Sequence, residues 1–295
     1  VVMWQSWNQS GQGSDIYGQH YAANGAPQGN EFLVNTTTAG DQSEASIAAL
    51  PNGGYVAVWR SLNFFSGTGI FAQQYAADNA KVGSEITINS GSGNYMQSSV
   101  AALADGSYVV TWVQQDSSIL AQHITADNVP AGPLVTVTVI SNTAGRVEGQ
   151  PQSVAALPGN GYIVTWVLNN YETQTTSIFA QQYAANDIPV GSPITISSAQ
   201  NSPSWVGGIA GASIATLPDG GYVVTWTLLS SDSVNKTTSI LAQQFAANNA
   251  PVNPPVTVSS AQAFTTSPGG AEVGGSSVAI LSDGSYVVTW MSHSY

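Results

Sequence analysis

The 295-residue chain has no cysteine and little charge of either sign. Without cysteine it forms no disulfide, no thiolate nucleophile and no Cys-ligated metal centre. Only 7% of its residues are charged, and 16 acids outnumber 4 lysines and arginines, for a formal net charge of −12. Phosphate backbones and anionic lipids need clustered basic side chains, so we expect no nucleic-acid partner and no docking to anionic membranes. No apolar run approaches the ~20 residues of a transmembrane helix, so we expect no membrane insertion.

What the chain has instead is a repeat. One pattern opens with the three-residue motif Ser-Ile-Ala or Ser-Val-Ala. The motif begins at Ser46, Ser99, Ser153, Ser213 and Ser277. A Gly- and Asp-rich turn follows, and then an apolar run that ends in Trp59, Trp112, Trp166, Trp226 and Trp290. A third run begins at Ile16, Ile70, Ile119, Ile178 and Ile240, and a short β-branched run such as 86–88 closes the unit. Asp-Gly and Asn-Gly between apolar runs are strong hairpin signals, through primed turns that need positive φ. Each unit is therefore predicted to form four antiparallel strands.

Four-stranded repeats of about 50 residues are typical of β-propellers. We predict an all-β chain, a five-bladed β-propeller in a single domain over residues 1–295. Four blades are expected at approximately 46–98, 99–152, 153–212 and 213–276, and a closing blade from 277–295 plus 1–45. The closing blade would take its first two strands from Ser277–Trp290 and its last two from 16–34, so that the N- and C-terminal strands close the ring and remove exposed sheet edges. Residues 1–4, which end in Trp4, are a sixth copy of the second-strand sequence. They would therefore lie outside a five-bladed ring, or the chain would be cut from a longer array of repeats.

The runs Ile16–Gly25, Val34–Gln42 and Ser46–Trp59 resemble the propeller-type repeats of large secreted bacterial proteins of the adhesin and RTX type. The resemblance covers nearly the whole chain. It implies secretion to the extracellular space or cell surface, attachment to cell-surface molecules, and often calcium. The chain lacks the Gly-Gly-x-Gly-x-Asp nonapeptides and the Asp-x-Asp-x-Asp-Gly loop that bind calcium, so the resemblance does not extend to those sites.

Sequence variation is confined to the loops after the second and fourth strands, which lie at one end of each blade. Loops on a rigid scaffold commonly carry function, so this end is the predicted binding face. Its non-repeating aromatic residues are either rings that stack on sugars or residues that pack the loops. They are Trp7, Phe64, Phe65, Tyr95, Tyr171, Trp205 and Phe264.

Five residues before each opening serine stand Asp41, Asn94, Glu148, Gly208 and Glu272. The first strand of a propeller blade usually lines the channel. Asp41, Glu148 and Glu272 could therefore ring the channel mouth and hold calcium through oxygen ligands. The alternative is that they are turn residues that accept backbone N–H groups. No other cofactor is predicted.

Repeated polar residues in the third strand are interpreted as structural. Gln19, Gln73, Gln122, Gln181 and Gln243 are predicted to satisfy backbone groups between blades. His20 and His123 occupy a position where other units have glutamine, which favours a hydrogen-bonding role. The repeated tryptophans are predicted to form the core.

No local motif marks an enzyme: there is no nucleophile elbow, phosphate loop or His-rich metal motif. A propeller glycosidase would need two carboxylates ~5–9 Å apart, with Glu44, Glu148, Glu172 and Glu272 as candidates. We predict a non-enzymatic extracellular adhesion module that recognises carbohydrate through the variable loops. The alternatives are a structural unit of an extracellular bacterial assembly or filament, in which the loops and termini mediate self-association, and a propeller glycosidase.

Overall fold

A computed structural model describes residues 1–7, 9, 13–63, 67–91, 93–114, 118–139, 153–170, 175–201, 208–231, 236–259, 262–264 and 275–291. These residues form antiparallel β-sheets, with a single 3-10 turn, η1 (Pro158–Asn160), and no α-helix among them. No helix in this part of the chain is long and apolar enough to cross a membrane. The chain divides into two compact units, Val1–Thr138 and Val139–Tyr295.

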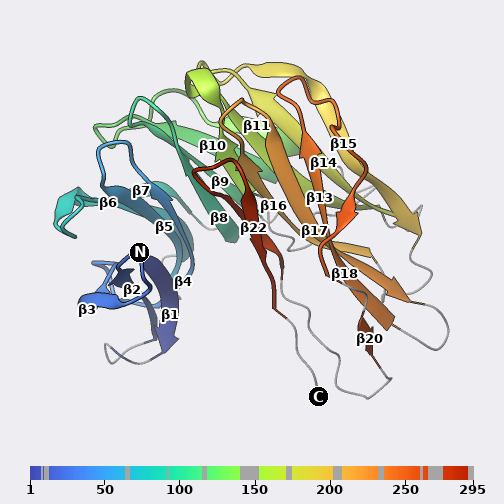
Figure 1. The fold of residues 1–295 in the computed structure, drawn as a ribbon. Helices are drawn as coiled ribbons and strands as arrows, with labels where there is room; N and C mark the ends of the chain where they lie inside the picture. The colour runs from blue at the N-terminus through green and yellow to red at the C-terminus, as the bar shows by residue number, and fades with distance from the viewer. Residues whose placement is uncertain are drawn as a thin grey trace. The chain divides into compact units, whose positions relative to one another are not determined.

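The first unit holds three sheets, in which consecutive strands lie side by side (Figure 1). The first sheet consists of β1 (Val2–Trp7), β2 (Ser14–Tyr21) and β3 (Pro27–Leu33). The second consists of β4 (Asp41–Ala49), β5 (Tyr55–Asn63), β6 (Gly67–Tyr75) and β7 (Lys81–Gly91). The third consists of β8 (Tyr95–Ala102), β9 (Tyr108–Gln114), β10 (Ser118–Ile124) and β11 (Val135–Val139).

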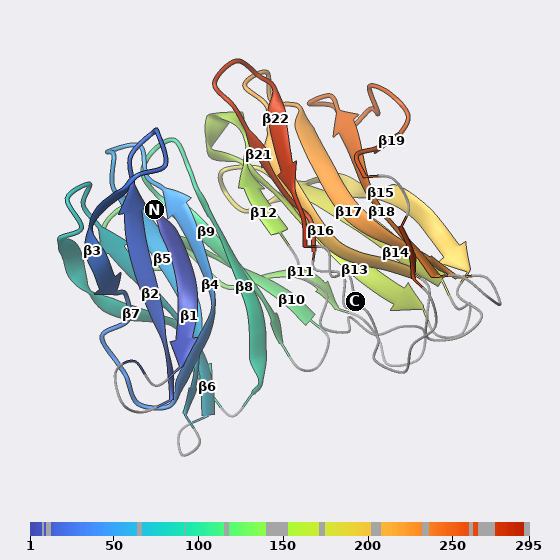
Figure 2. The same ribbon diagram turned by 60° about the horizontal axis from the view of Figure 1, so that its bottom comes forward.

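The second unit repeats this arrangement (Figure 2). Its first sheet consists of β12 (Ser153–Ala156), β13 (Tyr162–Asn170), β14 (Thr175–Tyr183) and β15 (Pro189–Asn201). The next consists of β16 (Gly208–Thr216), β17 (Tyr222–Ser231), β18 (Lys236–Phe245), β19 (Val256–Thr257) and β20 (Gln262–Phe264). The last pairs β21 (Ser277–Ile280) with β22 (Tyr286–Thr289). The predicted all-β class and the four-stranded units are therefore confirmed.

The predicted closing blade is not formed by the described strands. The edge of β2 that was expected to receive β22 is instead paired with β1, in a register that places Trp4 opposite Tyr17. The physical reason is the repeat phase: Val1-Val2-Met3-Trp4 is itself a second-strand sequence and binds the adjacent third strand. The described residues thus form six sheets, the first and last with fewer than four strands. Closure into a ring stays a prediction.

The core lies between neighbouring sheets of each unit, because both faces of the second strands β5, β9, β13 and β17 are covered. Trp59, Trp112, Trp166 and Trp226 are buried as predicted, and each lies in the strand that follows the hairpin turn. Trp290 is 40% exposed, in line with its sheet having only two strands among the described residues. Aromatic pairs such as Tyr162 and Tyr183, whose ring centroids are 4.9 Å apart, add stacked contacts across strands.

Four of the five hairpin turns between first and second strands have positive φ at one position, and the third has it at two, Gly159 and Asn160. In the Asp105-Gly106 hairpin only Gly106 has positive φ, at +88°, and its N–H donates to Leu103 O. The Asp105 side chain accepts from Ser107 N at 3.0 Å, and this bond and that of the Ser107 hydroxyl lower the pKa of Asp105. This is a three-residue loop that ends in a left-handed glycine, not the predicted primed turn.

Candidate functional site

Each sheet has two ends of different character. At the turn end lie the short hairpins after the first and third strands, and at the long-loop end lie the connections after the second and fourth strands. The long-loop connections 64–66, 115–117, 171–174, 202–207 and 232–235 fall outside the described residues. The inner strands that lead into this end are described, and they carry the candidate site.

The turn end is filled by a repeated structural device. Tyr55 and Tyr222 each donate a hydroxyl hydrogen bond to a left-handed asparagine of the next turn, Asn79 at 2.7 Å and Asn249 at 2.8 Å. His20 Nε2 contacts the same Asn79 oxygen from the preceding sheet, and His123 Nε2 contacts Ser107 Oγ at 2.9 Å. The predicted hydrogen-bonding role of the two histidines is therefore confirmed.

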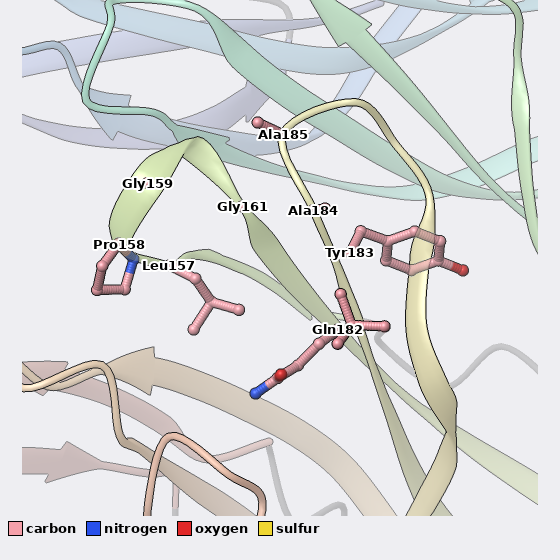
Figure 3. Close-up of a pocket in the computed structure, with 9 residues that line it drawn as sticks. Leu157, Pro158, Gly159, Gly161, Gln182, Tyr183, Ala184 and Ala185 are labelled. Carbon is pink, nitrogen blue, oxygen red and sulfur yellow. The ribbon is translucent and has the colours of Figure 1, made fainter.

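A pocket of about 270 Å³ also opens at the turn end, beside Leu157, Pro158 and Tyr183 (Figure 3). Most of its lining is apolar or glycine. The amide of Gln182 already donates to Ala247 O at 3.2 Å and Asn249 Oδ1 at 2.9 Å. Burial raises the pKa of the Tyr183 phenol to about 12, so this group is a poor proton donor or base at neutral pH. The pocket therefore lacks the convergent polar groups of a catalytic site.

The repeated third-strand glutamines act within one sheet, not between blades as predicted. Gln73 Nε2 donates to Gln74 O at 2.9 Å and Val82 O at 3.1 Å. Gln181 makes the same two contacts, to Gln182 O and Val190 O. The reason is a register shift between the third and fourth strands, which turns carbonyls of the fourth strand away from the ladder and toward this amide.

The long-loop end contains a strained acidic residue. Glu44 lies in a bulge of β4 with φ of +57°, a conformation that costs a non-glycine residue about 1–2 kcal/mol. Gln97 in β8 and Gly211 in β16 occupy the same repeat position, two residues before the opening serine, with φ of +55° each. The bulge thus suits glycine, and Glu44 is present despite the backbone cost.

Glu44 is paired with Arg60 on the next strand. Arg60 Nη1 donates to Glu44 Oε1 at 3.3 Å, and Nη2 donates to Asn94 Oδ1 at 2.9 Å. The other Glu44 oxygen accepts from Gln97 N of β8. The Glu44 side chain remains 35% exposed and that of Arg60 17% exposed. Hydrogen bonds therefore fix both the Arg60 guanidinium and the Glu44 carboxylate, and the carboxylate still reaches solvent.

This ion pair belongs to one unit of the repeat only. The residue that follows the repeated tryptophan is Arg60 here, but it is Val113, Val167 and Thr227 in the next three units, all buried. Arg60 is one of only 4 cationic residues in the chain. Arg60 Nε is buried and has no acceptor among the described residues, a property that it shares with core atoms such as Trp112 Nε1 and Trp226 Nε1.

Asp41 opens the same strand, β4, beside the first sheet. Its Oδ1 accepts from Ser14 N at 3.0 Å and from Ser14 Oγ at 3.3 Å. No described residue donates to its Oδ2. Next to it, Gln42 is fully buried and its Oε1 accepts from Trp59 Nε1 at 3.2 Å. Asp41 thus accepts a backbone N–H group, as the structural alternative predicted.

The predicted calcium ring is not brought together by the described residues. Glu148 and Glu272, like the candidate acid Glu172, lie outside them, and Asn94 accepts from Arg60. No group of three or more metal-binding side chains occurs in the described part of the chain. A calcium site at Asp41, Glu148 and Glu272 stays a prediction.

Of the predicted stacking aromatics, Trp7 and Tyr95 have described side chains. Trp7 is 66% exposed, the highest value among the large apolar side chains described. Tyr95 is buried in the cluster between the second and third sheets, so it is a packing residue and cannot stack on a ligand. Phe264 lies in β20, but its side chain is not described. Phe64, Phe65, Tyr171 and Trp205 lie outside the described residues.

Sequence reasoning missed Arg60, Gln97 and Ser14 as members of this end. A signal for Arg60 was present, because a cation replaces an apolar residue at a repeat position in a chain almost without cations. Gln97 and Ser14 carried no such signal, since their contacts depend on how one sheet packs on the next.

The chain was compared with known proteins. No family model matches the sequence, and no curated protein matches it. An α-L-arabinanase of Penicillium chrysogenum in complex with arabinobiose has a TM-score of 0.54 and 14% identity, and the match covers 84% of this chain and 74% of that one. An α-L-arabinofuranosidase of Fusarium graminearum with arabinobiose has a TM-score of 0.51, 12% identity and the same coverage. A protein of unknown function from Dyadobacter fermentans has a TM-score of 0.50 and 10% identity.

These neighbours are β-propellers, so the likeness supports a propeller fold. The comparison contradicts the non-enzymatic adhesion module predicted from the sequence, because the arabinanase and the arabinofuranosidase are hydrolases of glycosides, and the structural unit kept as its alternative fits no better. The physical reason for the error is that a propeller draws its catalytic carboxylates from separate strands and sheets. The lack of a local motif in a propeller sequence therefore does not argue against an enzyme.

Proposed function

We propose that the chain is a glycoside hydrolase that acts on a neutral polysaccharide at the long-loop end of β4. The observation that carries the proposal is Glu44, a solvent-reaching carboxylate held by Arg60 in a bulge where another unit has glycine. Strained backbone of this kind persists where the surrounding structure determines it, and it clusters at functional sites. The likeness to an arabinanase and an arabinofuranosidase supports the reaction class.

Glycoside hydrolysis uses two carboxyl groups, one as the acid and one as the nucleophile or general base. Glu44 accepts hydrogen bonds from the Arg60 guanidinium and from Gln97 N, which hold its carboxylate in place while it reaches solvent. Glu44 therefore suits the nucleophile or the base. The proton donor must be a different carboxyl group.

The charge of the chain bears on the substrate. With a formal net charge of −12, the protein repels anionic polysaccharides at low ionic strength. A neutral, hydroxyl-rich glycan meets no such barrier, and the Arg60 guanidinium that contacts Glu44 also contacts the amide oxygen of Asn94. Secretion, as implied by the resemblance to bacterial extracellular repeats, would place the enzyme where such polymers occur and stays a prediction.

The test is hydrolysis of soluble arabinan, xylan, galactan and β-glucan, followed by release of reducing sugar. E44Q should lower kcat by about 10²–10⁴-fold on the active substrate, the usual contribution of a catalytic proton-transfer or nucleophilic group. The matched control is E85Q. Glu85 is also a hydrogen-bonded carboxylate, contacting Thr36 N at 2.7 Å, but it lies on the outer strand β7.

A second variant separates chemistry from folding. In E44A the missing carboxylate leaves space for a small anion, so added formate should restore part of the lost rate, whereas a merely structural role gives no rescue. No hydrolysis of any of the four polymers by the wild-type protein, or equal kcat for E44Q and wild type, overturns the proposal.

A further inference from the structure

We infer that Trp7 is the stacking platform of a sugar-binding subsite that it forms with Ser14 and Asp41; this inference rests on the proposed hydrolase function. The long-loop end of the first sheet would thus hold one sugar ring of the glycan chain.

The position of Trp7 follows from the strand register. Trp7 is the last residue of β1 and lies directly opposite Ser14, the first residue of β2. Directly opposed residues of an antiparallel pair project to the same face, with Cβ atoms about 4.5–5.5 Å apart. Met3 lies on this face of β1 by alternation, and it packs against the cluster that contains Trp59. Trp7 therefore lies on the face of the first sheet that is turned toward β4.

On this face of the first sheet, the cross-strand neighbour of Trp7 contacts the carboxylate of Asp41. Ser14, its cross-strand partner, donates its backbone N–H and its hydroxyl to Asp41 Oδ1. Gly13 precedes it with φ of +77°, and a side chain there would meet Gly40 O at 2.7 Å and Asp41 Oδ1 at 2.9 Å. The backbone is thus packed tightly under Asp41, which fixes the carboxylate next to Ser14, the cross-strand partner of Trp7.

These groups match the two surfaces of a sugar. The C–H face of a neutral ring is apolar and covers an aromatic ring well, while its hydroxyl groups need hydrogen-bond acceptors at the edge. Trp7 offers an indole that is 66% exposed, and Asp41 Oδ2 accepts no hydrogen bond from any described residue. A neutral monosaccharide unit can therefore stack on Trp7 and donate a hydroxyl to Asp41.

The subsite lies within reach of the proposed chemistry. Asp41 and Glu44 are both on β4, and a β-strand rises about 3.3 Å per residue, so their Cα atoms are about 10 Å apart at most. Asp41 contacts the first sheet through Ser14 and Glu44 contacts the third sheet through Gln97, so only glycan units beyond the one on Trp7 would reach Glu44. We therefore expect Trp7 to govern the binding of polymer more than the chemical step.

The experiment is affinity electrophoresis in gels that contain soluble linear arabinan, performed in the inactive E44Q background so that the polymer stays intact. W7A should bind about tenfold more weakly, and W7F should keep most of the affinity because it keeps an aromatic face. The control is W290A, which removes another exposed tryptophan, 40% exposed, at the end of a second strand. In the active enzyme, W7A should raise KM for arabinan with little change in kcat.

The outcomes separate the inference from the proposed function. Equal binding by W7A and its parent, an equal loss in W290A, or no binding by the parent protein overturns the subsite. If W7A loses binding while E44Q hydrolyses arabinan like wild type, the subsite stands and the assignment of Glu44 fails. If E44Q loses hydrolysis while W7A retains both binding and KM, the hydrolase stands and the subsite fails.

Discussion

Replacing Gly106 by valine should destabilise the protein by about 1–2 kcal/mol through the backbone alone. Gly106 has φ of +88° in the hairpin between β8 and β9. A Cβ atom there would meet Ala126 Cβ at 3.5 Å, an ordinary van der Waals distance, so the Cβ atom itself creates no clash. What remains is the strain of a left-handed L-residue, about 1–2 kcal/mol and highest for β-branched side chains. At about 2–4 °C per kcal/mol, the melting temperature should fall by about 2–8 °C.

The assay is thermal unfolding followed by circular dichroism, with G106N as the matched variant. Asparagine tolerates the left-handed region, and the chain itself places Asn160 at the corresponding position of the third hairpin, with φ of +61°. G106N should therefore lose less than half of what G106V loses. An unchanged melting temperature in G106V would refute the assignment of the cost to this turn, and so would an equal fall in both variants.

Two further predictions concern stability. Q73L removes the amide that donates to Gln74 O and Val82 O, so it should lower the free energy of unfolding by about 1–3 kcal/mol in urea, whereas Q28A on exposed β3 should leave it unchanged. Stability should also fall as pH rises from 10 to 12. Burial raises the pKa of Tyr183 to about 12 and those of Tyr55 and Tyr108 further, so the folded state keeps protons that the unfolded state releases. A urea midpoint that stays flat over this range would contradict the burial of these phenols.

The repeating part of the fold was predictable because each unit solves the same local problem. Trp112 recurs in the chain because a second strand covered on both faces needs a large apolar residue, and Gly106 recurs because its hairpin needs one left-handed residue. The four full sheets follow from these positions. The pairing of β2 with β1 was not predicted. Residues 277–290 supply first and second strands and residues 16–34 supply third and fourth strands, so the two ends were expected to form one blade, although Val1–Trp4 also has a second-strand sequence.

The candidate site was predictable only in part. Trp7 could be selected as a non-repeating aromatic, and Glu44 as an acid worth testing, from their positions near the variable loops. Tyr95 looked the same in the sequence but is buried, because its neighbours come from the second sheet and not from its own loop. The contact of Gln97 N with Glu44 likewise spans 53 residues and depends on sheet packing. The sequence pattern shows which residues of a strand share a face. It does not show which residue of a neighbouring sheet each of them contacts.

A repeat protein makes an asymmetric site by changing side chains on a backbone that stays the same. The bulge before the opening serine has nearly the same φ at Glu44, Gln97 and Gly211, so the scaffold offers one geometry to three different chemistries. Arg60 replaces the buried apolar residue of its sister units, such as Val113, and its charge is balanced by the one acid in that series. Placing Glu44 in a left-handed bulge carries a backbone cost relative to the unit that has Gly211 there, and Arg60 puts a charge where a sister unit has a buried valine. Both substitutions occur in the same unit and point at one another, which is the arrangement expected when function, and not folding, maintains the pair.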